Sequence, residues 1–174
     1  MKRLSFYLPA VVLALTVWGI SPDLRGQSQQ NSTPQSAASS EALRTLKIRA
    51  LHAEPGKPSL YELRFTTSDS LPPDAELVIE FPTDLDLGLL EMASSTSING
   101  GFTISKERNL VRVRRTGLGA TVPPGRAVDL KLGLIKNPEN LSLAPRVSVE
   151  LRSASGKVAS VKRSFSVEFM RRSN

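Results

Sequence analysis

The sequence predicts an all-β protein, an antiparallel β-sandwich of seven to eight strands that follows a signal peptide and a disordered polar linker. Three observations support this fold. Apolar and polar residues alternate in seven short segments after residue 45. Glycine, proline and asparagine gather between these segments, where turns are needed. The chain of 174 residues is long enough for one such domain and a tail.

The N-terminus has the residue order of a secretory signal peptide. Residues 1–3 supply a positive start, residues 4–20 an apolar run, and residues 21–26 a polar end. We expect cleavage after Gly26, with Gly19 as the second choice. Because an apolar run of 17 residues approaches the length that crosses a bilayer, an uncleaved anchor is the alternative. Either route predicts an exported protein that is periplasmic, secreted or at the cell surface.

Three further regions follow the predicted signal peptide at residues 1–26. Residues 27–43 form a flexible polar linker, because hardly any of their side chains can bury apolar surface. Residues 44–170 form the β-sandwich, and residues 171–174 a basic tail. The sandwich must be held together by its apolar core, since the chain contains no cysteine for a disulfide.

Each alternating segment predicts a strand with one buried and one solvated face, which is typical of antiparallel sheets. The segments lie at residues 46–50, 61–65, 77–81, 111–114, 128–134, 147–152 and 165–169. In the second segment, the alternation places Tyr61 inside. In the fifth segment, it places Val128, Leu130, Leu132 and Leu134 in the core and Asp129 in solvent.

Turn residues separate these segments at intervals that favour a sandwich of immunoglobulin-like type, with a closed barrel as the alternative. Pro55-Gly56, Asn99-Gly100-Gly101 and Asn137-Pro138 are among these turns. The stretch from Gly117 to Ala120 also predicts a turn, because it lacks the helix that a phosphate-binding loop requires. Residues 84–93 break the alternation and predict a loop or a single helical turn.

Three stretches resemble a known kind of module. Residues 61–67 read YELRFTT, residues 77–82 read LVIEFP, and residues 128–138 end in Asn-Pro. From about residue 44 to 170 the chain resembles immunoglobulin-like domains of exported and cell-surface bacterial proteins, where such domains often occur as repeats. The resemblance implies a structural β-sandwich module, and its motifs contain no catalytic residue that could be transferred to this chain.

The residue inventory offers little for catalysis or cofactor binding. The lack of cysteine excludes thiolate catalysis and cysteine-ligated metals. The only histidine, His52, has no local nucleophile or orienting carboxylate and is interpreted as a solvated turn residue. Asp84 and Asp86 could hold Ca²⁺ with backbone carbonyls, but without a glycine-centred ligand loop solvated carboxylates are the favoured interpretation. We therefore expect no cofactor and no enzyme activity, a hydrolytic enzyme being the least favoured class.

Five basic residues fall close together across one expected hairpin and form the candidate binding site. They are Lys106, Arg108, Arg112, Arg114 and Arg115. In the alternating register, Arg112 and Arg114 leave the same outer face, where a ladder of positive charge could bind anionic glycans or lipid headgroups. The other interpretation is a solvated strand face on which charge prevents edge-to-edge pairing. No aromatic residue interleaves with the ladder, so nucleic acid is not an expected partner.

Taken together, these patterns predict a non-catalytic, exported β-sandwich module that binds a protein or a component of the cell envelope. The alternative is a module that binds polyanions or the envelope surface through the basic hairpin. The net charge of +7 at neutral pH is compatible with both functions.

Overall fold

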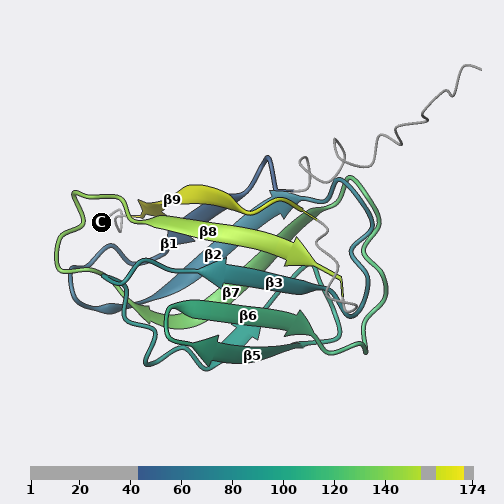
Figure 1. Cartoon of the computed structure of the whole chain (residues 1–174), viewed down its shortest axis with the longest axis horizontal. Coiled ribbons are helices and arrows are strands. Elements are labelled where there is room, and N and C mark those ends of the chain that lie inside the picture. Colours follow the sequence, from purple (N-terminus) through teal and green to yellow (C-terminus); the bar gives the residue numbers. More distant parts are fainter. Residues whose placement is uncertain (1–42, 154–159, 171–174) are drawn as a thin grey trace, which may run out of the picture. The chain divides into compact units, whose positions relative to one another are not determined.

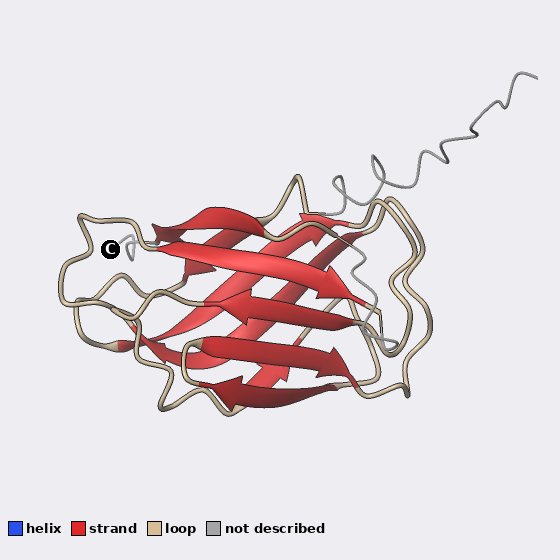
Figure 2. Ribbon diagram, viewed as in Figure 1, coloured by secondary structure: helices blue, strands red, loops and turns tan. Residues whose placement is uncertain are grey.

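A computed structural model of the chain describes residues 43–153 and 160–170. The predicted signal peptide, the linker up to residue 42 and the basic tail lie outside the described residues. Within them, every regular element is a strand (Figure 2). The described residues contain no helix of the length and apolar character needed to cross a membrane.

Nine strands make up the described domain, more than the seven to eight expected. They are β1 (Lys47–Ala50), β2 (Pro58–Thr66), β3 (Glu76–Glu80), β4 (Met92–Ser94), β5 (Phe102–Glu107), β6 (Leu110–Arg115), β7 (Ala127–Lys136), β8 (Arg146–Arg152) and β9 (Arg163–Phe169).

The strands form two layers that join at β9 (Figure 1). One layer has the order β4-β7-β2-β1-β9 and the other β9-β8-β3-β6-β5. The first half of β9 pairs with β8, as in Arg146↔Ser166, and its second half pairs with β1, as in Ile48↔Val167. The β1–β9 pair is parallel and every other strand pair is antiparallel. The predicted all-β, immunoglobulin-like sandwich is thus confirmed, with one parallel pair added.

The core lies between the two layers and contains most of the residues that the alternation placed inside. Ile48, Leu63, Ile79, Val113 and Val149 are all fully buried there. The predicted inward orientation of Tyr61 is also confirmed; its hydroxyl donates a hydrogen bond of 2.8 Å to Oδ1 of buried Asn137. Burial, with a contribution from the negative charge of Asp84, raises the pKa of the Tyr61 phenol.

The expectation for residues 84–93 is correct for most of the segment and wrong at its end. Leu85, Leu87 and Leu90 are buried, so an irregular loop contributes to the core. Met92 and Ala93 belong to β4, which pairs with β7. The sequence did not reveal this strand because three residues are too few to display a period of two.

The prediction that Leu134 faces the core is wrong. Ser59 and Tyr61 of β2 pair with Ile135 and Leu132 of β7. One residue therefore separates the paired positions in β2, whereas two residues separate them in β7. This extra residue is a β-bulge, and it inverts the alternation, because side chains change face with every residue of a strand. Leu134 is consequently 45% exposed, while Ile135 is fully buried.

Removing one carbon from each of these neighbours tests the inversion. Ile135→Val is expected to lower the free energy of unfolding by about 1 kcal/mol, because it opens space in the core. Leu134→Val is expected to change it by less than about 0.5 kcal/mol, because the side chain is solvated. Urea unfolding of both variants measures the difference, and equal losses would contradict the assigned register.

Candidate functional site

The predicted hairpin exists, but it does not bring the five basic residues together. Strands β5 and β6 pair antiparallel, with Lys106 opposite Val111 and Ser105 opposite Arg112. Arg108 lies in the exposed two-residue turn between them, with a positive φ of 55°. Nζ of Lys106 donates hydrogen bonds to the carbonyls of Leu87 (3.0 Å) and Gly88 (3.3 Å). Lys106 thus holds the loop that precedes β4.

Arg112 and Arg114 do share the outer surface of β6, next to β3 and β8. Figure 1 shows β8, β3 and β6 side by side in one layer. We call this surface of β8, β3 and β6 the charged face. Across it, Glu76 lies between Arg114 and Arg152, and Val78 lies between Arg112 and Glu150. The remaining members of the charged face are Glu80, Arg146, Ser148 and Leu110. Although Val78 is on the outer side, it is only 7% exposed, because it lies beneath its charged neighbours.

Positive charge on this face exceeds the negative charge that neutralises it. Nη1 of Arg112 lies 3.9 Å from Oε2 of Glu76, and Nε of Arg152 lies 2.8 Å from Oε1 of Glu150. Glu80 pairs with Lys162, whose hydrogen bond and charge lower the pKa of that carboxyl.

Two arginines of the charged face are left over. Arg114 and Arg146 are exposed and have no acidic partner among residues 43–153 and 160–170. They are the charges available to a ligand.

Arg115 points the opposite way and is 2% exposed. Its guanidinium donates hydrogen bonds to the carbonyls of Leu71 (2.8 Å), Pro72 (2.6 Å) and Ala120 (2.6 Å). A longer contact of 3.4 Å reaches the carbonyl of Asn99. Burial lowers the pKa of the Arg115 guanidinium. The arginine therefore joins the β2–β3, β4–β5 and β6–β7 loops at one end of the sandwich.

The Gly117–Ala120 stretch belongs to the last of these loops and contains no helix, in agreement with the prediction that it connects strands. Gly119 passes so close to the β4–β5 loop that an added Cβ would lie 2.0 Å from the carbonyl oxygen of Asn99. No side chain fits at this crossing. Leu118, between two glycines, is 87% exposed.

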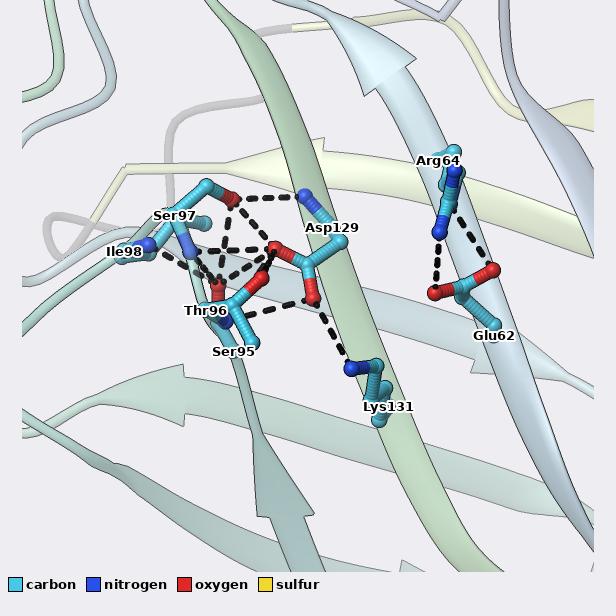
Figure 3. Close-up of polar contacts among 8 residues, drawn as sticks. All are labelled: Glu62, Arg64, Ser95, Thr96, Ser97, Ile98, Asp129 and Lys131. Carbon is cyan, nitrogen blue, oxygen red and sulfur yellow. Dashed lines mark hydrogen bonds and ion pairs between the residues drawn. The ribbon is translucent and has the colours of Figure 1, made fainter.

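The carboxylate of Asp129, which the alternation predicted to be solvated, is buried and accepts more hydrogen bonds than any other side chain among the described residues (Figure 3). Oδ1 of Asp129 on β7 accepts hydrogen bonds from the hydroxyls of Ser95, Thr96 and Ser97, at 3.3, 2.9 and 2.6 Å. It also accepts from the amides of Thr96 (3.1 Å) and Ser97 (3.0 Å). Nζ of Lys131 lies 3.8 Å from Oδ2 of Asp129.

These contacts determine the charge state of Asp129. Burial alone would raise the pKa of its carboxyl, but the hydrogen bonds from Ser97, Thr96 and Ser95 outweigh that effect and lower it to about 2. The carboxylate therefore stays ionised at neutral pH, and the donors gathered on its Oδ1 anchor the β4–β5 loop to β7. The run of hydroxyl residues at 94–97 was the only signal of this cluster in the sequence.

The other candidates for chemistry, His52, Asp84 and Asp86, lie in exposed loops. The amide of His52 donates to the hydroxyl of Ser59 at 3.0 Å, and its side chain is exposed. Oδ1 of Asp86 accepts a hydrogen bond of 2.8 Å from the amide of Gly88. The described residues contain no group of three histidine, cysteine or acidic side chains arranged to hold a metal ion.

Comparisons with known proteins gave matches only among solved structures. No family model matches the sequence, and no curated protein matches it. Among solved structures, a cohesin module of a Clostridium perfringens family 33 glycoside hydrolase is 14% identical, with a TM-score of 0.45 over 72% of this chain and 97% of that one. The collagen-binding subdomain of the Enterococcus faecalis surface protein ACE is 10% identical, with a TM-score of 0.45 over 71% and 95%. No functional residue is carried over from either structure.

Proposed function

We propose that the chain is a non-catalytic, exported module that binds a protein partner through the charged face. The observation that supports this most directly is the presence of Arg114 and Arg146 without acidic partners on an otherwise ion-paired sheet surface. Arginine is enriched among the residues that dominate binding energy at protein interfaces. The unpaired positive charges of Arg114 and Arg146 favour a partner with an acidic surface, because complementary electrostatic potentials on two proteins speed their association and select the partner.

The architecture of the face suits this role. Its residues stand on three hydrogen-bonded strands, so little conformational entropy is lost when a partner docks. Ion pairs with Glu76 and Glu150 restrain Arg112 and Arg152 on either side of the nearly buried Val78. An ordered sheet surface of this kind suits a macromolecular partner.

A second candidate function is binding of an anionic glycan or lipid headgroup by the same free arginines. It is favoured by the exposed Arg108 in the β5–β6 turn, which adds a positive charge at the opposite end of β6 from Arg114. Binding of this type depends mainly on charge number and decreases steeply with salt.

Charge reversal separates the two functions. We expect Arg114→Glu with Arg146→Glu to reduce capture of the partner from envelope extracts at least tenfold. Lys47→Glu with Arg126→Glu changes the net charge equally at exposed sites away from the charged face, and should leave capture unchanged. Undiminished capture by the first variant would contradict the proposed site. Loss of salt-sensitive heparin retention in that variant, without any captured protein, would favour the polyanion function.

A further inference from the structure

An open hollow lies between the β5–β6 turn and the loop that follows β3. The strand β3 ends beside this turn, where the amide of Phe81 donates a hydrogen bond of 2.9 Å to the carbonyl of Asn109 (Figure 1). The hollow has a volume of about 650 Å³, which is within the range of about 300–1,000 Å³ that is typical of small-molecule sites. The residues around it include Leu85, Asp86 and Leu87 of the loop and Lys106 and Arg108 of the hairpin.

Lys106 places an ordered positive charge in this hollow. Its ammonium group has three N–H donors, and two of them reach the carbonyls of Leu87 and Gly88, at 3.0 and 3.3 Å. No acidic side chain among residues 43–153 and 160–170 forms an ion pair with it. The third donor is therefore available to a ligand. Because the side chain is already held in place, little conformational entropy is lost when a ligand binds.

Arg108 supplies a second positive charge from a backbone conformation that arginine rarely adopts. It is the first of the two residues between Glu107 and Leu110, and its φ is 55°. Glycine and asparagine enter this left-handed region more readily than residues with larger side chains. Backbone strain of this kind is concentrated at active sites and ligand-binding sites. Arg108 is exposed, lines the hollow and has no acidic partner in the described part of the domain.

The other residues of the hollow decide which anions fit. Leu85 and Leu87 are only 5% and 8% exposed, so they form an apolar base. Asp86 contributes one carboxylate, whose Oδ1 accepts a hydrogen bond of 2.8 Å from the amide of Gly88. Two positive charges and one negative charge leave the hollow with a net charge of +1. This charge matches a monoanion, whereas the Asp86 carboxylate repels a dianion more strongly.

We propose that the hollow binds a small apolar monocarboxylate, whose carboxylate is held by Lys106 and Arg108 and whose apolar part lies on the two leucines. Both cations form charge-assisted hydrogen bonds with a carboxylate, and the guanidinium can donate two of them in parallel. The site uses neither of the free arginines of the charged face. It therefore stands or fails independently of partner binding through that face.

Titration of the ¹⁵N-labelled full chain with hexanoate at pH 7, followed by NMR, tests the site. Saturable shifts are expected at the amides of residues 83–88 and 106–109. Three related probes each change one property of hexanoate: acetate lacks the apolar part, hexylamine has the opposite charge, and hexyl phosphate has the higher negative charge. Each should bind at least threefold more weakly than hexanoate. Equal or tighter binding of any of the three, shifts centred elsewhere, or no saturable shift with hexanoate would overturn the proposal.

Arg108→Asn separates ligand binding from stability. Asparagine suits the left-handed backbone but carries no charge, so this variant should bind hexanoate at least fivefold more weakly and yet unfold at a higher urea concentration. Arg126→Asn is the matched control, because it removes an exposed arginine from the β6–β7 loop, at the other end of β6, and should leave hexanoate binding unchanged. Equal hexanoate binding by the two variants would overturn the site. A lower urea midpoint for Arg108→Asn would also overturn it, because the arginine would then serve the fold.

Discussion

Replacing Arg115 with leucine is expected to lower the free energy of unfolding by about 3 kcal/mol. Arg115 donates three short, charge-assisted hydrogen bonds, to the carbonyls of Leu71, Pro72 and Ala120. Each such bond contributes about 1.5–3 kcal/mol, and the relief of no longer burying a cation offsets part of their sum. Because three loops share this one side chain, the substitution should destabilise the whole domain and not a single loop. Denaturant unfolding measures the change in the free energy of unfolding.

Arg114→Leu is the matched control, because it removes the neighbouring arginine from the exposed face of the same strand. A surface change of this kind is expected to alter the free energy of unfolding by less than about 0.5 kcal/mol. Arg115→Lys should retain only part of the stability, since the single ammonium group of lysine cannot donate to as many separate carbonyls as the planar guanidinium does. If Arg115→Leu and Arg114→Leu cost the same, the loop-joining role of Arg115 is wrong.

Asp129→Asn is expected to lower the free energy of unfolding at pH 7 by about 2 kcal/mol, through loss of the charge that the hydroxyl cluster stabilises. The asparagine keeps the shape of the side chain and one carbonyl oxygen for the donors of residues 95–97. The depressed pKa of Asp129, about 2 against an ordinary 3.8, gives the size of the effect.

The pH dependence of this difference follows from the direction of the shift. A carboxyl whose pKa is lower in the folded state stabilises the fold above its unfolded pKa, and the stabilisation disappears as pH falls through the folded pKa. The gap between wild type and Asp129→Asn should therefore be full at pH 6–7, begin to shrink near pH 4 and close near pH 2. Unfolding curves at a series of pH values measure the gap, and a gap independent of pH would show that the charge of Asp129 does not stabilise the fold.

Local alternation was sufficient to predict most strands of this domain and the side of each that is buried. The segments around Ile48, Leu63, Ile79 and Val149 alternate in a way that only a half-buried strand satisfies, and all four residues are in the core. The failures occurred where the alternation was too short or was interrupted. β4 has three residues, and the bulge near Gly133 shifts the phase within a single run.

The candidate site shows the same limit. Alternation placed Arg112 and Arg114 on one outer face, but it could not show that Glu76 neutralises Arg112, because that carboxylate comes from a strand distant in the sequence. Arg115 belongs to the same basic run, yet its side chain turns inward to carbonyls of other loops. A run of basic residues does not itself reveal which of them remain free to bind a ligand.

The sequence by itself determined the class of the fold, the faces of most strands and the inward position of Tyr61, because these depend on a period of two that neighbouring residues establish together. Only the tertiary structure decided which charges are neutralised and which are buried. Asp129 lies among hydroxyls 32–34 residues away in the chain, and β4 is formed as a strand by its pairing with the distant β7. Contacts between distant segments create these properties, so no local pattern contains them.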